Sequence, residues 1–440
     1  MTSRSLATTF SRLVAGVILV LTTLLYSGDR ALAQGKRELS VAVVLFLSGP
    51  AAAHFGIPAR NGAELAFEAL NAGGAPPPYD LPGFGGRTAV PEYVDEAGGA
   101  TKQVAEFRNL VQRRAIDLVM GYVSSGDCLA IPQVAEELGQ LTILIDCGTP
   151  RVFEEASYRY VFRTGPHAVM DNVAAARYLL ARHPDVKTIA GLNQNYAWGQ
   201  DSWTDFKESM RVLEPGIEVV DEQFPRLFAG QFGAEISSLL AQRPDVIHTS
   251  FWGADLEALV NQGVGRGLFT RSLLVLSVGE HVLPRIGDRI PDGTIVGARG
   301  PHGDFAPPGP LNDWFRAAYV ERYGIVPNHP AYKTAMAVMG LKTAMDKAAA
   351  AAGGVPTQDQ LIAALEYLEW DSPSGPVKLA LADGHQAIQA NAIGLTRYDP
   401  GLGRITVEDV AYYPAECVNP PPGIAGLDWI KQGFPGADCD

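Results

Sequence analysis

The sequence predicts an α/β protein made of two doubly wound, parallel-sheet lobes, and three observations support this prediction. The chain has 440 residues, a length at which a single core usually splits into separate domains. Its composition, 47% hydrophobic and 19% charged, is typical of globular proteins. From Leu39 onward, short β-rich segments alternate with amphipathic helices in two successive series, which indicates parallel sheets with helical crossovers.

The first series begins with a buried strand over residues 39–46 and a helix over residues 58–71. Apolar residues at positions i, i+3, i+4 and i+7 from Ala63 form one helical face, and Gly73 ends the helix. The series continues with helices over 101–113 and 129–138 and strands over 117–121 and 141–145.

The second series follows Arg163 and repeats the same alternation. It comprises helices over 168–182, 201–213, 233–242 and 255–262 and strands over 187–192, 217–223, 245–251 and 272–276. Beyond a Gly- and Pro-rich stretch over 279–310, three further helices are expected over 311–323, 329–351 and 358–368, and their pattern allows them to cover either sheet. The tail over 417–440 is rich in Pro and Gly and predicts little regular structure.

The first 33 residues have the order of a secretory signal. Arg4 and Arg12 give a positive start, residues 13–26 are mostly apolar, and a small-residue site at 31–33 precedes Gln34. The alternative is a membrane anchor, but an apolar stretch of about fourteen residues is shorter than the roughly twenty needed to span a bilayer. We therefore expect cleavage after Ala33 and export to the periplasm.

The chain contains four cysteines, an even number that suggests disulfides in an exported protein. Cys417 and Cys439 enclose the tail, and we predict that they form a disulfide. Cys128 and Cys147 follow neighbouring strands, but whether they are bridged stays open, since Cys147 is also a candidate for ligand contact. Neither pair shows the spacing of a zinc site, and we expect no metal and no cofactor.

Charge and motifs exclude other classes of protein. The net charge is −13 and the basic residues are scattered, so we expect no nucleic-acid partner. No Gly-x-Ser-x-Gly elbow and no phosphate-binding Gly-Lys loop occurs, and Glu280 beside His281 has no nucleophile near it in sequence. We therefore expect a protein that is not an enzyme.

Two turns with small hydroxyl residues follow neighbouring strands. Ser125 comes after strand 117–121 and Thr149 after strand 141–145, so both turns lie at one edge of a parallel sheet. Unpaired N–H groups at helix starts favour anions, and the two turns together are suited to a carboxylate. Alternatively, Ser125 caps its helix and Thr149 shapes a turn.

Aromatic residues gather at equivalent strand ends. Phe55 follows the first strand, Tyr196 and Trp198 follow strand 187–192, and Trp252 follows strand 245–251. Some of these rings are expected in the core, but their place beyond the strands, among Gly and amide residues, favours walls of a cleft.

Taken in order, several segments resemble the leucine/isoleucine/valine-binding protein family, whose members are substrate-binding proteins of ABC transporters. The resemblance covers nearly the whole chain after the signal segment. It rests on Leu-Ser-Gly-Pro at 47–50, Phe-Gly at 55–56, Asn-Gly-Ala-Glu-Leu-Ala at 61–66, Val-Met-Gly-Tyr-Val-Ser-Ser-Gly at 119–126, Tyr-Val-Phe-Arg-Thr at 160–164 and Tyr-Ala-Trp-Gly at 196–199.

The resemblance implies a type I periplasmic binding protein, a monomer whose two lobes are joined by a three-strand hinge and which passes a small molecule to a membrane permease. Lobe one would comprise residues 36–160 plus 300–388, and lobe two residues 161–299 plus 389–416. It further implies the ligand-binding residues Ser125, Cys147 and Thr149 for the carboxylate and ammonium, Phe55, Tyr196 and Trp252 for the aromatic walls, and Glu280, or Gly279 in its place, near the ammonium.

The chain departs from the family pattern in ways that leave the ligand open. Cys147 stands where amino-acid binders usually have Ala or Gly, Asp146 before it is unusual, and Trp198 and Trp252 are bulky for a leucine-sized pocket. An amino acid is the first expectation, with an aromatic acid, an amide or another small metabolite as alternatives. A ligand sensor and, least favoured, a periplasmic hydrolase are the alternative functions.

Overall fold

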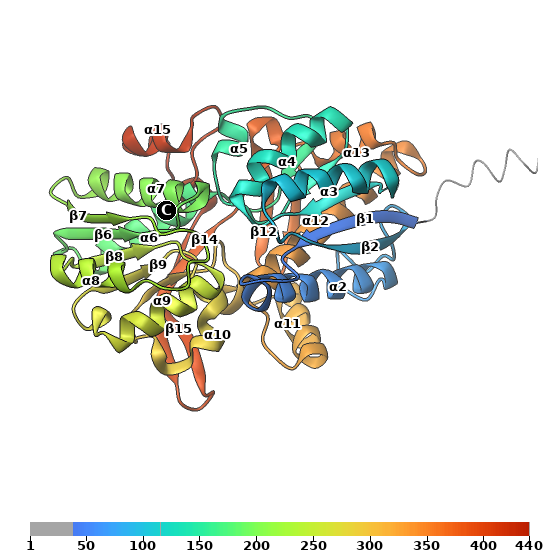
Figure 1. The fold of residues 1–440 in the computed structure, drawn as a ribbon. Coiled ribbons are helices and arrows are strands. Elements are labelled where there is room, and N and C mark those ends of the chain that lie inside the picture. Colours follow the sequence, from blue (N-terminus) through green and yellow to red (C-terminus); the bar gives the residue numbers. More distant parts are fainter. Residues whose placement is uncertain (1–37, 115, 440) are drawn as a thin grey trace, which may run out of the picture.

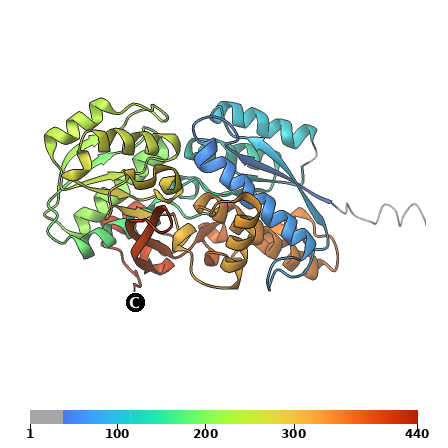
Figure 2. The same cartoon turned by 90° about the horizontal axis from the view of Figure 1, so that it is seen from below.

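The computed structural model describes residues 38–114 and 116–439, so the predicted signal segment over 1–33 lies outside the described residues. Figure 1 shows two α/β lobes side by side, one containing the blue N-terminal strands and the other the green and yellow middle of the chain. The view from below in Figure 2 shows the same two bodies, with chain segments passing between them. The predicted two-lobed α/β fold is confirmed.

The first lobe is built on an eight-stranded sheet with the strand order β11-β12-β13-β5-β4-β3-β1-β2. The strands from β5 to β2 are parallel to one another, whereas β11 and β12 add antiparallel strands at the other edge. The strands are β1 (Glu38–Leu45), β2 (Thr88–Asp95), β3 (Leu118–Gly121), β4 (Thr142–Leu144), β5 (Val161–Arg163), β11 (Glu369–Ser372), β12 (Gly375–Leu381) and β13 (Gln386–Ile388).

Helices cover both faces of this sheet. One face packs against α2 (Ile57–Ala72), α11 (Pro310–Tyr323), α12 (His329–Ala352) and α13 (Gln358–Leu365). The other packs against α3 (Ala100–Arg113) and α4 (Ser125–Leu138). The three helices whose place the sequence left open therefore all belong to the first lobe.

The second lobe is built on a seven-stranded sheet with the strand order β15-β14-β10-β9-β8-β6-β7. Its strands are β6 (Thr188–Leu192), β7 (Glu218–Gln223), β8 (Val246–Thr249), β9 (Leu273–Leu276), β10 (Ile295–Gly297), β14 (Asn391–Asp399) and β15 (Arg404–Tyr413), of which β14 and β15 are antiparallel. Its faces are covered by α6 (Ala168–Arg182) and α7 (Ala197–Leu213) on one side, and by α8 (Gly233–Gln242), α9 (Gly253–Gly265) and α10 (Leu283–Ile286) on the other.

The chain crosses between the sheets at three places. It passes from β5 to α6, from β10 to α11, and from β13 to β14. Since β5 pairs with β4 and β13, the first crossover begins after Arg163. Three such connections between two lobes are the arrangement expected of a hinge.

The structure differs from the sequence-based expectation at β2, which was not predicted. Pro91 lies inside this strand, and its residues are largely half-exposed. Both features are typical of an edge strand, because an edge strand can lack a ladder N–H group and needs no buried alternating pattern. β2 indeed occupies the outer edge beside β1.

The tail also differs from the expectation of little regular structure. It contains α14 (Ala415–Val418) and α15 (Gly426–Lys431), and Trp429 and Ile430 are fully buried against the α6 and α7 side of the second lobe. The predicted Cys417–Cys439 disulfide is present. Apolar packing and a covalent link therefore hold the tail together, whereas its Pro and Gly content predicted little regular structure. No helix in residues 38–114 and 116–439 has the length and hydropathy to cross a membrane.

Candidate ligand-binding site

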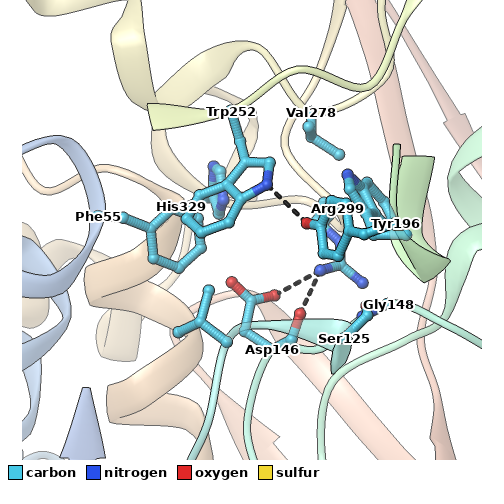
Figure 3. A pocket seen from close by; sticks show the side chains of 11 residues that line it. Phe55, Ser125, Asp146, Gly148, Tyr196, Trp252, Val278, Arg299 and His329 are labelled. Atoms are coloured by element: carbon cyan, nitrogen blue, oxygen red, sulfur yellow. Dashed lines mark hydrogen bonds and ion pairs between the residues drawn. The ribbon is translucent and has the colours of Figure 1, made fainter. Parts of the chain in front are cut away.

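A pocket lies between the two lobes at the carboxyl ends of their parallel strands. Counted together with its opening to solvent, about 280 Å³ of space lies between the protein atoms that line it. Figure 3 shows side chains from both lobes pointing into this space. The lining residues are Phe55, Val123, Ser125, Asp146, Gly148, Tyr196, Trp198, Trp252, Val278, Arg299 and His329.

The first-lobe wall begins at the N-terminus of α4. Ser125 is the first residue of this helix, and its Oγ accepts the backbone N–H groups of Gly148 and Thr149 at 3.2 Å each. These two bonds join the turn after β3 to the turn after β4, as the positions of the hydroxyl residues predicted. In the described part of the chain the Ser125 hydroxyl acts only as an acceptor, so its proton can be donated to a ligand.

A buried carboxyl pair lies behind this turn. Glu96 accepts the N–H groups of Val123 and Ser124, each at 2.8 Å, and is hydrogen-bonded to Asp127. Burial, followed by the neighbouring Asp127, raises the pKa of Glu96 well above its usual value, and burial raises the pKa of Asp127 to about 6. The pair therefore keeps a proton into the neutral pH range. Glu96 also accepts two backbone N–H groups at the start of α4, where the sequence predicted that such groups would bind the ligand.

The turn after β4 brings Asp146 and Gly148 to the pocket. A Cβ atom on Gly148 would lie 2.1 Å from Cζ3 of Trp198, a separation that non-bonded carbon atoms do not adopt. Glycine is therefore required here by the close approach of a second-lobe ring to a first-lobe turn. This contact depends on the lobes being closed on each other.

Two other candidates on the same turn lie outside the lining. The sulfur of Cys147 is bonded to Cys128 in a disulfide, which resolves the question left open by the sequence. The Thr149 hydroxyl donates to Asp201 Oδ2 at 2.6 Å. Both side chains thus stabilise the turn, and Asp146 and Gly148, which flank Cys147, are the ones that face the pocket.

The second-lobe wall is mainly aromatic. Tyr196 and Trp198 lie at the start of α7, and Trp252 lies just before α9, so all three follow strand ends as predicted. Trp252 Nε1 donates to the Tyr196 hydroxyl at 2.7 Å, which fixes the two rings relative to each other. Phe55, on the short helical turn η1 (Ala52–Gly56), meets Trp252 edge to face at 5.6 Å between ring centroids.

A buried group of four charged side chains, here called the charged cluster, consists of Asp146, Asp171, Arg299 and Lys333. Arg299 Nη1 donates to Asp146 Oδ1 at 2.9 Å, Arg299 Nε donates to Asp171 Oδ2 at 3.1 Å, and Lys333 Nζ donates to Asp146 Oδ1. The Arg299 guanidinium also lies over the Trp198 ring at 4.6 Å from its centroid. The cluster connects the β4 turn, α6, α12 and the crossover after β10.

Burial shifts the titration of this cluster. Desolvation and the neighbouring Arg299 lower the pKa of Lys333 to about 8, and desolvation raises the pKa of Asp171 to about 6 despite Arg299 and Lys333. Both groups remain mostly charged at neutral pH. His329 lies beside the cluster, and burial lowers its pKa well below its usual value, so it is neutral.

Glu280, the predicted partner of a ligand ammonium, lies outside the pocket lining. Its Oε2 accepts the backbone N–H of His329 at 2.8 Å, and its side chain is packed against Gly303. Burial raises the pKa of Glu280 to about 8, so its charge is largely lost at neutral pH. Gly279, the alternative at this position, lies against Leu276 and is also absent from the lining.

Sequence reasoning missed Arg299 and His329, and it noted Asp146 only as unusual. Asp146 carries the one usable signal, a charged residue directly after a buried apolar strand. Arg299 lies in a Gly- and Pro-rich stretch and His329 at a helix start, and neither has a local pattern that separates it from ordinary surface residues. Within the described residues, no group of His, Cys, Asp and Glu side chains is suited to hold a metal ion.

Comparisons with known proteins agree with this architecture. The model of a family described as periplasmic binding protein matches residues 38–397. A search of curated proteins found no match. Among solved structures, a solute-binding protein of an ABC transporter from Rhodopseudomonas palustris BisB5, in complex with 3,4-dihydroxybenzoic acid, is similar with a TM-score of 0.74 and 20% identity, covering 86% of this chain and 98% of that one.

Two further similar structures carry amino-acid transporter names. An amino acid ABC transporter substrate-binding protein from Pseudomonas fluorescens Pf-5 has a TM-score of 0.71 and 20% identity, with 85% of this chain and 95% of that chain covered. A branched-chain amino acid transporter protein from Rhodopseudomonas palustris CGA009 has a TM-score of 0.65 and 23% identity, with 87% and 98% covered. At these sequence identities the similarity shows a shared fold and nothing beyond it.

Proposed function

The chain belongs to the periplasmic binding protein family, and from that premise we propose that it is the solute-capturing component of an ABC importer. In this role it clamps a small carboxylate between its lobes and delivers it to a membrane permease. Membership of a family of binding proteins agrees with the resemblance drawn from the sequence and confirms the prediction that the chain is not an enzyme.

The observation that carries the proposal is the pocket between the lobes. Its lining comes from the carboxyl ends of strands in both sheets, the position at which open α/β sheets bind ligands. Because each lobe supplies about half of the wall, a ligand in the pocket would favour the closed arrangement. Binding a ligand by closing the two lobes around it involves no chemical reaction and therefore requires no catalytic residues.

We propose that the first-lobe wall orients the ligand carboxylate and the second-lobe wall covers its apolar part. Ser125 is suited to donate its hydroxyl proton to the carboxylate, since its acceptor side is already occupied by two N–H groups. Phe55, Tyr196 and Trp252 form the aromatic walls, as inferred from the resemblance. Cys147 and Thr149 would act indirectly, by holding the β4 turn in place.

Two ligand classes fit this pocket, an amino acid and an aromatic acid. Similar structures carry names of both kinds, with amino acid transporters on one side and complexes with 4-hydroxybenzoate and benzoate on the other. The aromatic class is favoured by the four rings in the lining and by the withdrawal of Glu280 from the pocket. The second candidate function is that of a ligand sensor that closes around its ligand in the same way. The two functions differ in the protein that the closed, ligand-bound form would bind, a transporter permease or a signalling partner.

We also propose the cellular setting and the lobe division expected from the sequence. The mature chain would begin at Gln34 in the periplasm after removal of residues 1–33. The expected lobes are residues 36–160 plus 300–388 and residues 161–299 plus 389–416. Because β5 pairs in the first sheet, the boundary moves past it, and the lobes would be 36–163 plus 300–388 and 164–299 plus 389–416.

Calorimetric titration of the purified mature chain with a panel of amino acids, benzoates and small amides tests the proposal. We expect one ligand site per chain, a carboxylate among the binders, and a smaller radius of gyration by small-angle scattering at saturation. Saturation without any change in scattering would contradict capture by closure. A panel in which only uncharged amides bind would contradict the carboxylate.

A further inference from the structure

Asp146 is a polar group of the pocket with unused bonding capacity. Its side chain is 2% exposed, and its Oδ1 accepts hydrogen bonds from both Arg299 Nη1 and Lys333 Nζ. Its Oδ2 is buried and has no hydrogen-bond partner. Figure 3 shows the carboxylate projecting between Phe55 and Arg299 into the centre of the pocket.

An unpaired carboxylate oxygen is costly in a buried site. Removing it from water without a compensating hydrogen bond is unfavourable, and buried carboxylate oxygens therefore normally accept N–H or O–H donors. In the described structure the donors close to Asp146 are all directed at Oδ1 or at its backbone oxygen. A ligand in the pocket that places a hydrogen-bond donor at Oδ2 would satisfy this remaining acceptor.

The charges around Asp146 decide between a charged and a neutral donor. The charged cluster already contains two cations and two carboxylates, and a third buried cation, Arg163, lies behind the β4 turn, where it donates to the backbone oxygen of Thr149 at 2.6 Å. A ligand ammonium at Oδ2 would add a further cation beside Arg299 and Lys333. Repulsion between like charges is large where water is excluded, so a neutral donor is favoured over an ammonium.

The other groups that face this point do not alter the balance. His329 is neutral, and the side chains of Tyr196, Trp198, Trp252 and Val278 in the second-lobe lining carry no charge. Glu154 acts on the charge of Arg163, and the Glu96–Asp127 pair lies behind Ser125, so these carboxyl groups offset the third buried cation. The surroundings of Asp146 Oδ2 thus favour an uncharged donor over an ammonium, and the carboxylate of the ligand is taken from the proposed function.

We propose that Asp146 Oδ2 accepts a hydrogen bond from a hydroxyl group of the ligand, so that the solute is a hydroxylated carboxylic acid and not an amino acid. This rests on the proposed function, since it assumes that the pocket between the lobes takes a small carboxylate. In this proposal Asp146 determines which ligand binds. The resemblance to amino-acid binders did not imply a ligand contact at this position.

Matched sets of acids that differ in one group test the proposal on the wild-type chain by calorimetry. One set is 3-phenyllactate, phenylalanine and 3-phenylpropionate, which carry a hydroxyl, an ammonium and a hydrogen on the same carbon. A second is 2-hydroxy-4-methylpentanoate, leucine and 4-methylpentanoate, and a third is 4-hydroxybenzoate and benzoate. Since hydrogen bonds to charged groups contribute roughly 1.5–3 kcal/mol, the hydroxyl member of at least one set should bind about ten- to a hundredfold more tightly than its partners.

Two variants assign the preference to the residue. Asp146→Asn should reduce the advantage of the hydroxyl member to less than about threefold, because the amide is a weaker acceptor. Asp409→Asn is the matched control, a carboxylate on β15 that bonds Arg182 and the Tyr178 hydroxyl and lies outside the pocket lining. It should keep the hydroxyl preference.

The outcomes separate this inference from the proposed function. If acids bind but the ammonium or hydrogen member of every set equals or exceeds the hydroxyl member, the role of Asp146 is refuted and the binding-protein proposal stands. The same holds if the hydroxyl preference survives in Asp146→Asn. If none of the acids binds the wild-type chain, the small carboxylate of the proposed function fails, and the inference fails with it.

Discussion

The two walls of the pocket are built in different ways. On the first lobe the polar groups are held by other protein groups: Ser125 accepts two N–H groups, and Asp146 binds Arg299 and Lys333. On the second lobe the wall consists of large rings, and Trp252 and Tyr196 bond mainly to each other. The first wall is therefore fixed by a network that also includes Arg299 at the crossover after β10, whereas the second provides contact area that reaches the ligand only when the lobes close.

This difference separates two contributions to binding. Fixed polar groups determine ligand specificity, because a ligand that leaves a buried charge unpaired binds with a free-energy penalty. Aromatic area raises the affinity for any ligand with an apolar part, roughly in proportion to the area covered. Substitutions in the first wall should change ligand choice, and substitutions in the second should lower affinity for all ligands alike.

The largest effect is expected where the walls meet. In Gly148→Ala the new methyl group would lie 2.1 Å from the Trp198 ring, so the lobes could not close fully. Because overpacking costs about 1–3 kcal/mol or more, affinity for the best acid should fall about a hundredfold by calorimetry. Gly126→Ala is the control, since its nearest neighbour would be 3.6 Å away and its affinity should stay close to wild type. Equal affinities for the two variants would show that the approach of Trp198 is not needed for binding.

The aromatic wall comes next. Trp252→Ala removes a ring that is 4% exposed and contacts Phe55, so a ligand would lose a large apolar surface. We expect a loss of about 2 kcal/mol, or roughly thirtyfold in affinity, for acids of every kind in the panel. A loss confined to one ligand of the panel would contradict the separation between the two walls.

The polar wall predicts a smaller and selective change. Ser125→Ala removes one hydroxyl donor, so carboxylates should bind about tenfold more weakly, while the corresponding amides should change less than threefold. Ser124→Ala is the matched control, because Ser124 precedes the helix without a side-chain cap and is absent from the lining. If acids and amides weakened equally in Ser125→Ala, the serine would not be the carboxylate donor.

The carboxyl pair behind the first wall predicts a small effect of pH on stability. The pKa of Asp127 is raised to about 6 in the folded state from a usual value of 3.8, so the folded protein holds more protons than the unfolded chain between these values. The free energy of unfolding should therefore fall as the pH rises from about 4 to 6. Asp127→Asn should remove about 1–2 kcal/mol of this fall, measured by urea unfolding at several pH values.

The control for this experiment is Asp359→Asn, an exposed carboxyl group on α13. It should leave the pH dependence of the wild type unchanged. If the free energy of unfolding of Asp127→Asn depended on pH as it does in the wild type, the buried pair would not hold an extra proton in the folded state.

The fold was largely predictable because its helices are amphipathic and its central strands are apolar. The predicted limits of α6 and α8 agree with the structure, since the apolar faces of both helices pack against the second sheet. β2 was missed because an edge strand needs no buried pattern. The antiparallel strands β14 and β15 were missed because their pairing depends on partners in the second sheet that are remote in sequence.

The site was predictable only as far as strand ends determine it. Phe55, Ser125, Tyr196 and Trp252 lie in the lining because the carboxyl ends of parallel strands converge there. The side chains of Cys147, Thr149 and Glu280 are instead bonded to Cys128, Asp201 and the His329 backbone, and such pairings across the fold leave no trace in local sequence. The charged cluster was hidden for the same reason, since Asp146 and Arg299 are far apart in the chain.

The central claim is that one small acid lies between the polar wall and the aromatic wall. A crystal structure of the mature chain with the tightest binder of the panel tests it most directly. The account predicts ligand density bounded by Ser125 and Asp146 on one side and by Trp252 on the other, with the carboxylate within hydrogen-bonding distance of the Ser125 hydroxyl. Density elsewhere, for example in the cavity between Arg163 and the Pro420–Pro421 segment of the tail, with the pocket between the lobes empty, would contradict it.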